Sequence, residues 1–156
     1  MTLEGLNDDF QDVVTQLADA GVEFMIVGAF ALAFHGAPRA SGDIDLFVRP
    51  SDENATRVYE ALLRFGAPLA VHGVAAADFA REGSVYQIGL PPRRIDILTQ
   101  ISGVTFDEAW TSRVDAEVNS RSVPVIGRAA LVKNKTAAGR PKDVADVARL
   151  TKTAQR

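Results

Sequence analysis

Cysteine is absent from the 156 residues of this sequence. Its absence excludes disulfides, thiolate metal sites and cysteine nucleophiles. The sequence also lacks any run of about 18 apolar residues, so it predicts no membrane-spanning helix. The first ten residues are acidic and contain no long apolar stretch, so we expect no signal peptide. Together these absences favour a cytoplasmic protein whose chemistry depends on carboxylates, hydroxyls and nitrogens.

Strong charge of one sign is also missing, because the formal net charge is only −3 at pH 7. Binders of long nucleic acids usually carry a broad basic surface, so general nucleic-acid binding is disfavoured, although a local basic patch is not excluded. Hydrophobic residues make up 47% of the chain and charged residues 24%, which is ordinary for a globular protein. At this length we expect a single domain over residues 1–156.

Helical and strand patterns alternate in the first half of the sequence, and strands cluster after residue 84. Helical spacing and capping residues predict helices near residues 8–20, 29–35, 52–65, 106–110, 128–138 and 142–151. Apolar or alternating runs predict strands near residues 22–27, 43–48, 85–89, 93–99, 114–118 and 122–126. Residues 67–83 have no clear pattern, apart from one expected helical turn at residues 78–81. This order predicts an α/β (α+β) fold in which helices flank a mixed central β-sheet.

Two aspartates, Asp43 and Asp45, open the second expected strand. Residues i and i+2 of a strand point to the same face, so both carboxylates should project together. Two like charges this close raise each other's pKa unless a cation lies between them. Mg²⁺ is a hard cation that binds a few carboxylates together with substrate phosphates. The turn at Gly28 leads into a helix N-terminus, which is a natural phosphate site, so the pair predicts metal-dependent phosphoryl-group chemistry.

A third aspartate, Asp96, takes the polar position in an otherwise apolar expected strand. Burying an unpaired carboxylate costs free energy, so this side chain needs a partner. One alternative is an ion pair with Arg93 or Arg94. The other is a metal shared with Asp43 and Asp45, because three carboxylates on neighbouring strands can hold two Mg²⁺ ions roughly 3.5–4 Å apart.

Taken in order, these elements resemble the signature of the nucleotidyltransferase superfamily, which includes DNA polymerase beta and kanamycin nucleotidyltransferase. The signature consists of Gly28-Ala29, thirteen further residues, Asp43-Ile44-Asp45 and a distant strand aspartate, Asp96. A closer resemblance is to the small bacterial group related to AbiEii-type toxins. It lies in the motif HGxPR at residues 35–39 and the motif KxAxGRPKDxxD at residues 135–146. The likeness covers most of residues 22–150.

The resemblance implies a nucleotidyltransferase fold and Mg²⁺-dependent transfer of a nucleoside monophosphate from a nucleoside triphosphate to an acceptor hydroxyl, with release of pyrophosphate. It implies that Asp43, Asp45 and Asp96 are the catalytic residues and bind two Mg²⁺ ions. It also implies that backbone N–H groups at Gly28 approach the β- and γ-phosphates. The chain departs from the family at Ala29, where Gly or Ser is usual and where some relatives direct a hydroxyl at a phosphate. Ala29 still offers its backbone N–H, so with Gly28 it is expected to be a nucleotide-binding residue.

Four further residues are candidate nucleotide-binding groups: Arg39, Ser41, Lys135 and Arg140. The guanidinium of Arg39 matches phosphate geometry, although a solvated loop arginine is the alternative. Ser41 could contact a phosphate or cap its own loop. Lys135 shares a helix face with apolar residues, so its ammonium is expected to reach an anion such as the triphosphate or the aspartate cluster.

The remaining polar residues of the motifs are expected to support the site. Asp143 and Asp146 share one helix face and are expected to pair with Lys135 or Arg140. His35 lies on a mainly apolar helix, and we expect it to hold a loop by a hydrogen bond rather than to act as a base.

Other functions stay open at this point. A catalytically weak nucleotide-binding module could act through a partner, as in a toxin–antitoxin pair, because 156 residues leave little chain for a separate acceptor-binding domain. An unrelated metal-dependent phosphohydrolase would share the acidic cluster without a base pocket. The acceptor could be a tRNA 3′ end, a protein or a small molecule, and an antitoxin or a second copy of the chain could be a partner. The sequence does not define the preferred base.

Overall fold

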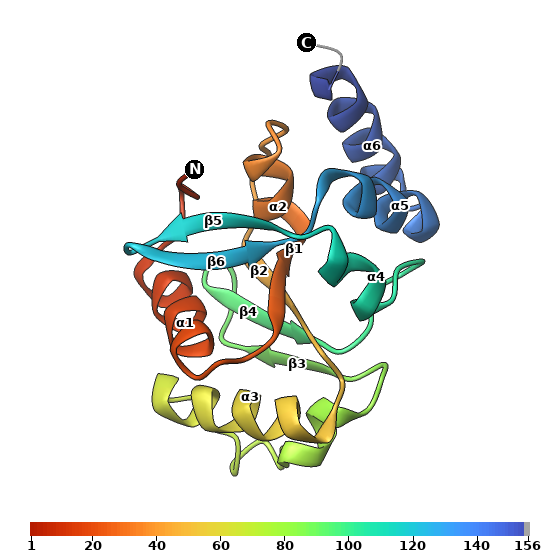
Figure 1. Cartoon of the computed structure of the whole chain (residues 1–156). Helices are drawn as coiled ribbons and strands as arrows, with labels where there is room; N and C mark the ends of the chain where they lie inside the picture. The colour runs from red at the N-terminus through yellow and green to blue at the C-terminus, as the bar shows by residue number, and fades with distance from the viewer. Residues whose placement is uncertain (155–156) are drawn as a thin grey trace.

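The computed structural model describes residues 1–154 (Figure 1). Its helices are α1 (Asp8–Asp19), α2 (Gly28–Phe34), α3 (Asp52–Phe65), the 3₁₀ helix η1 (Ala76–Ala80), α4 (Phe106–Thr111), α5 (Arg128–Ala138) and α6 (Pro141–Ala154). Its strands are β1 (Phe24–Val27), β2 (Asp43–Val48), β3 (Val85–Ile88), β4 (Arg94–Leu98), β5 (Val114–Val118) and β6 (Arg121–Val125). The predicted elements are therefore all present, with ends that differ by a few residues.

The described strands form one six-stranded sheet in the order β3-β4-β2-β1-β6-β5. Strand β2 pairs antiparallel with β1 and parallel with β4, and β3 pairs antiparallel with β4. On the other side of β1, β6 runs parallel to it and β5 pairs antiparallel with β6. This arrangement confirms the predicted mixed sheet flanked by helices, and it places β2 and β4 side by side near the middle.

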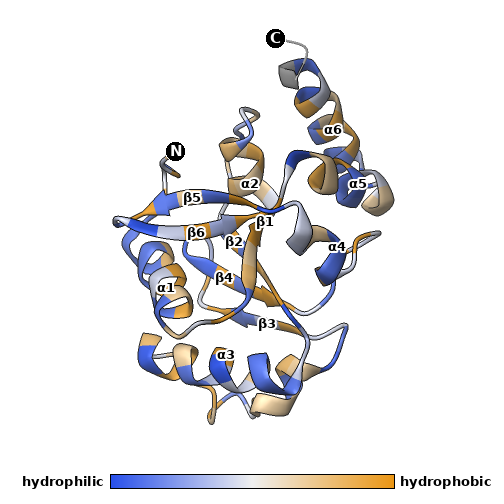
Figure 2. Cartoon of the chain, in the orientation of Figure 1, coloured by the Kyte–Doolittle hydropathy of each residue, from blue (hydrophilic) through white to orange (hydrophobic). Residues whose placement is uncertain are grey.

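The two sides of β2 face different environments. Ile44, Leu46 and Val48 are fully buried on one side. Asp43 and Asp45 alternate with them and point to the opposite side. Figure 2 shows β1 as predominantly hydrophobic and α3 with hydrophilic and apolar residues alternating along its turns. The hydrophobic core thus fixes the register that sends the aspartates outward.

Helices α1 and α3 begin at capping side chains, as the sequence predicts. The side chain of Asn7 accepts a hydrogen bond from Phe10 N at 2.9 Å, and Ser51 Oγ accepts one from Asn54 N at 3.2 Å. The last helix begins at Pro141, one residue before the predicted start at residue 142. Proline is compatible with this position because the first turn of a helix leaves its backbone N–H groups unpaired.

The segment that the sequence left ambiguous, residues 67–83, contains the short helix η1. Within the part of the chain that the structure covers, no helix has the length and apolar character needed to cross a bilayer.

Candidate active site

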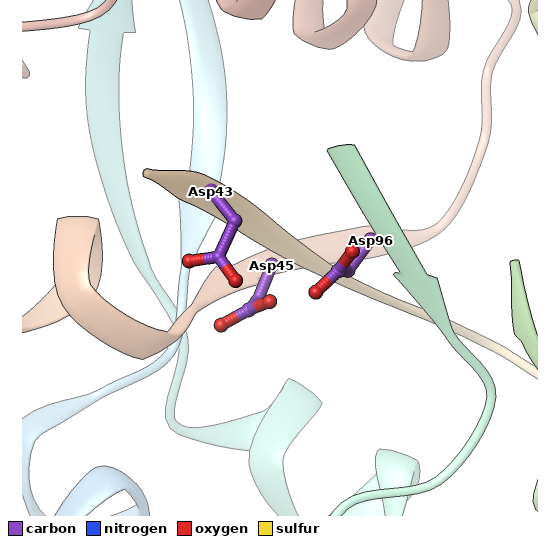
Figure 3. Close-up of side chains that lie close together, drawn as sticks. All are labelled: Asp43, Asp45 and Asp96. Atoms are coloured by element: carbon purple, nitrogen blue, oxygen red, sulfur yellow. The ribbon is translucent and has the colours of Figure 1, made fainter. Parts of the chain in front are cut away.

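Pairing between β2 and β4 brings the three predicted catalytic aspartates together. Asp45 lies directly opposite Asp96 in the parallel ladder. Asp43 lies two residues before Asp45 on the same face of β2. One carboxylate oxygen from each of the three residues lies within 4.8 Å of the others. Figure 3 shows the three carboxylates pointing into the same space from two adjacent strands.

Within this triad, the carboxyl group of Asp45 has a strongly raised pKa. Burial raises the pKa of the Asp45 carboxyl, and the charges of Asp43 and Asp96 raise it further, to about 7. The positive charge of Lys135 opposes the increase only in part. A carboxyl with this pKa lacks enough positive charge around it, which is the condition that a divalent cation would correct.

Gly28 gives the Asp45 carboxylate the space that it occupies. Gly28 has φ of +70°, and a Cβ atom added there would lie 2.2 Å from Asp45 Oδ2. Only glycine combines a left-handed conformation without strain with this close approach. The glycine turn and the Asp-x-Asp motif are therefore one structural unit, in which the backbone of residue 28 touches the side chain of residue 45.

Arg94 contacts two aspartates of the triad, although the sequence does not predict it as a site residue. Its Nη2 donates to Asp43 Oδ2 at 2.5 Å, and its Nε donates to Asp96 Oδ1 at 3.0 Å. The ion pair with Arg94 that was considered as an alternative explanation of Asp96 is therefore present, together with the convergence of the aspartates. The spacing of Arg94 and Asp96, two residues apart on one strand, is the signal that could have revealed it.

A second group of charges links α5 and α6 behind the triad. Lys135 is only 5% exposed, and its Nζ lies 3.2 Å from Asp143 Oδ1 and 3.3 Å from Asp146 Oδ2. Arg140 Nε donates to Asp143 Oδ2 at 2.6 Å. Burial raises the pKa of Asp143, but hydrogen bonds from Arg140 and Lys135 outweigh it and lower the pKa to about 2. These contacts confirm the expected pairing of the two tail aspartates with Lys135 and Arg140.

The six predicted nucleotide-binding residues border two different hollows. Gly28, Lys135 and Arg140 line a cavity of about 440 Å³, next to Asp45. Ala29, Arg39 and Ser41 line a second hollow of about 940 Å³. The residues that the sequence groups as one nucleotide site thus border two hollows rather than one.

Arg39 and Ser41 both have partners within the protein. Arg39 Nε donates to Asp146 Oδ1 at 3.0 Å, so this loop arginine connects the segment before β2 to α6. Ser41 Oγ donates to Asp43 Oδ1 at 2.8 Å and accepts a bond from the backbone N–H of Asp43. Ser41 thereby orients a carboxylate of the triad in addition to capping its loop.

His35 lies away from the triad and has the structural contact that the sequence predicts. Its Nε2 lies 2.7 Å from the carbonyl oxygen of Ile126, so that ring nitrogen carries the proton. Burial lowers the pKa of the His35 imidazole, and the nearby Arg128 charge lowers it further. A neutral histidine that ties α2 to the end of β6 fits these contacts.

Three polar side chains on the wall of the 440 Å³ cavity were not singled out from the sequence: Gln100, Ser102 and Asn134. Asn134 Nδ2 donates to the backbone oxygen of Ser102 at 3.0 Å, which joins α5 to the loop after β4. Asn134 lies 32 positions after Ser102, and the three residues form no local motif, so only the folded chain reveals their proximity.

The donor set of the triad fits a hard divalent cation. Three carboxylates supply oxygen ligands only, which is the chemistry that Mg²⁺ prefers. Their oxygens converge within 4.8 Å, and the glycine at position 28 leaves the Asp45 carboxylate accessible from the cavity. Asp43, Asp45 and Asp96 are the residues that would hold the ion.

Solved structures with the same fold are nucleotidyltransferases. The lincosamide antibiotic adenylyltransferase LnuA, solved with lincomycin, is 12% identical, with a TM-score of 0.57 over 96% of this chain and 99% of its own. ANT(2")-Ia, solved with adenylyl-2"-tobramycin, is 14% identical, with a TM-score of 0.58 over 92% of this chain and 86% of its own. A nucleotidyltransferase-like protein from Paracoccidioides brasiliensis is 16% identical, with a TM-score of 0.53 over 92% and 76% of the two chains. At these identities the likeness establishes the fold.

The family is established by sequence. No curated protein matches the chain. The family model described as nucleotidyl transferase AbiEii toxin, type IV TA system, matches residues 13–154. That range contains the glycine turn, all three aspartates of the triad and the paired charges of α5 and α6. The chain therefore belongs to the AbiEii family of nucleotidyltransferase toxins.

Proposed function

We propose that this nucleotidyltransferase is Mg²⁺-dependent and transfers a nucleoside monophosphate from a nucleoside triphosphate to an acceptor hydroxyl, releasing pyrophosphate. The observation that carries the proposal is the convergence of Asp43, Asp45 and Asp96 beside Gly28. When bound, Mg²⁺ would neutralise phosphate charge and lower the pKa of the acceptor hydroxyl. One or two ions are compatible with three carboxylates.

The residues of the chain position the reactants around this triad. Gly28 lines one hollow and its neighbour Ala29 lines the other, so the backbone of this turn can approach the triphosphate. Arg140 borders the 440 Å³ cavity and is more than half exposed, so its guanidinium can add a contact to a phosphate. Such positioning, together with neutralisation of charge, supplies most of the catalysis in phosphoryl-group transfer.

Lys135 has a different part in the proposal. Because it is buried and ion-paired with two aspartates, it supplies a fixed positive charge near Asp45 rather than a mobile side chain that reaches for the nucleotide. Arg39 supports the same arrangement through its ion pair with Asp146. These contacts lock α5 and α6 against the loop that precedes the Asp-x-Asp motif.

The proposed partners are an antitoxin and an acceptor that carries a hydroxyl group. Membership in a toxin–antitoxin family supports an antitoxin as the protein partner. The acceptor belongs to one of three classes, a tRNA 3′ end, a protein hydroxyl or a small molecule. LnuA is a lincosamide antibiotic adenylyltransferase and ANT(2")-Ia was solved with adenylyl-2"-tobramycin, which supports testing small molecules as well as macromolecules.

The decisive experiment compares the wild type with Asp45→Asn, using each nucleoside triphosphate in labelled form. With the label on the α-phosphate, the wild type should place it on an acceptor from a cell extract, and with the label on the γ-phosphate it should release labelled pyrophosphate. Asp45→Asn keeps the shape of the side chain but removes its charge, so it should lose transfer while staying folded. Asp115→Asn, at an exposed position of β5, is the matched control.

Three results would contradict the proposal. Undiminished transfer by Asp45→Asn would remove the triad from the mechanism. Release of labelled orthophosphate in place of pyrophosphate would identify a phosphohydrolase. Nucleotide binding without turnover over many acceptors would identify a binding module.

A further inference from the structure

Arg94 holds two members of the triad at once. It is the first residue of β4, it lies opposite Asp43 in the ladder, and it precedes Asp96 by two positions. Its Nη2 contacts both carboxylates, at 2.5 Å from Asp43 Oδ2 and 3.2 Å from Asp96 Oδ2, while its Nε bonds Asp96 Oδ1. The guanidinium therefore occupies three of the four oxygens that Asp43 and Asp96 offer.

These oxygens belong to the set that a divalent cation would use. A guanidinium and a metal ion bound to the same carboxylates repel each other across a few ångströms. The side chains differ in freedom, because Arg94 is 30% exposed and Asp43 26%, whereas Asp96 is 8% exposed. The contact with Asp43 is thus the one that can open, and the contact with the buried Asp96 is the one that can persist.

The β-ladder holds the carboxylates in place independently of Arg94. Asp45 and Asp96 are adjacent through the pairing of β2 with β4, and Ser41 Oγ separately bonds Asp43. Loss of Arg94 therefore removes positive charge without dispersing the triad.

We propose that Arg94 is the resident counter-cation of the metal-free site, and that its bond to Asp43 is exchanged for a divalent cation. This inference rests on the proposed function in that it assigns the triad to metal binding. Arg94 stabilises the protein before the metal binds and weakens metal affinity by competing for Asp43. A toxin built in this way stays folded at low metal concentration and responds to changes in that concentration.

The test compares Arg94→Gln with Arg93→Gln and uses Mn²⁺ as the probe. Arg93 is the adjacent residue, it is 54% exposed, and its ion pair is with Asp9 at 2.9 Å, outside the triad. Mn²⁺ binding is measured by calorimetry and by electron paramagnetic resonance, without nucleotide, at a pH above the pKa of Asp45 (about 7). Thermal unfolding is measured in EDTA and in excess Mn²⁺.

The expected results separate the two arginines. Arg94→Gln should bind Mn²⁺ about tenfold more tightly than the wild type, because a competing positive charge is gone. Its unfolding midpoint should fall by about 3 °C in EDTA and recover in Mn²⁺, since a ligand that binds only the folded state stabilises it. Arg93→Gln should keep the wild-type affinity for Mn²⁺. Arg94→Lys, which retains one charge but cannot bridge two carboxylates, should lie between the wild type and Arg94→Gln.

The inference is overturned if Arg94→Gln binds Mn²⁺ no more tightly than the wild type, or if its loss of stability persists in Mn²⁺. It is also overturned if no variant binds Mn²⁺. None of these readouts involves turnover, so a protein that shows the Arg94 effect and transfers no nucleotide would refute the proposed function while leaving this inference standing.

Discussion

The contact between Gly28 and Asp45 allows a sharp prediction. Replacing Gly28 by Ala introduces a Cβ atom 2.2 Å from Asp45 Oδ2, closer than real Cβ atoms approach any neighbour. The carboxylate then has to move by roughly 1 Å, and a displacement of that size in a catalytic group can reduce the rate about 100-fold. The substitution also places alanine at φ +70°, which costs about 1–2 kcal/mol.

Gly21→Ala separates these two effects. Gly21 has φ of +72°, almost the same value, but nothing lies within 4 Å of a Cβ atom added there. Both variants should therefore lose about 1–2 kcal/mol of unfolding free energy in urea, from the backbone conformation that they share. Only Gly28→Ala should also lose about 100-fold in nucleotide transfer and bind Mn²⁺ more weakly. Equal transfer by the two variants would refute the idea that residue 28 must be glycine to accommodate the Asp45 carboxylate.

Three further predictions concern charge, packing and pH. Lys135→Met should destabilise the protein by about 3 kcal/mol in urea because it leaves buried aspartates underpaired, whereas Lys133→Met, 57% exposed, should change stability by less than about 0.5 kcal/mol. Gly103→Ala puts a Cβ atom 2.4 Å from Ala137 Cβ, so it should destabilise α5, and a double-mutant cycle with Ala137→Gly should show favourable coupling. Since the pKa of Asp45 is raised to about 7, its contribution to stability is complete below about pH 4 and is lost as the pH rises through 7. In EDTA, the free energy of unfolding of the wild type should thus fall by up to about 4 kcal/mol relative to that of Asp45→Asn over this pH range. If urea unfolding gave the two proteins parallel profiles of stability against pH, the prediction would be wrong.

The helices, the strands and the direction of the paired aspartates could be predicted because each depends on residues close together in the chain. Alternation on β2 places Ile44 and Leu46 in the core, so Asp43 and Asp45 have to point the other way. Capping at Asn7 and Ser51 also depends on neighbours only a few positions away. Such local constraints leave few alternatives, and the predicted boundaries were accordingly close to those observed.

Contacts between distant segments were predicted less completely. The sequence offers a metal ligand and a partner of Arg94 as alternatives for Asp96. The observed geometry is compatible with both, because Arg94 contacts both Asp96 oxygens while the same carboxylate converges with those of Asp43 and Asp45, and each carboxylate oxygen can accept more than one contact. Arg39 was considered as a phosphate ligand, and the structure pairs it with Asp146, 107 positions away. Its contact with phosphate stays a prediction, because an arginine has several donors and this contact uses one of them.

What the sequence determined by itself is the set of elements, the outward direction of the paired aspartates and the family to which the chain belongs. Each follows from residues close together in the chain or from motifs in a fixed order. Only the tertiary structure decided that Gly28 touches Asp45, that Arg94 bridges Asp43 and Asp96, and that the predicted nucleotide-binding residues border two hollows. The physical reason is that strand order and register bring these groups together, and both are set by packing of the whole core rather than by any one segment.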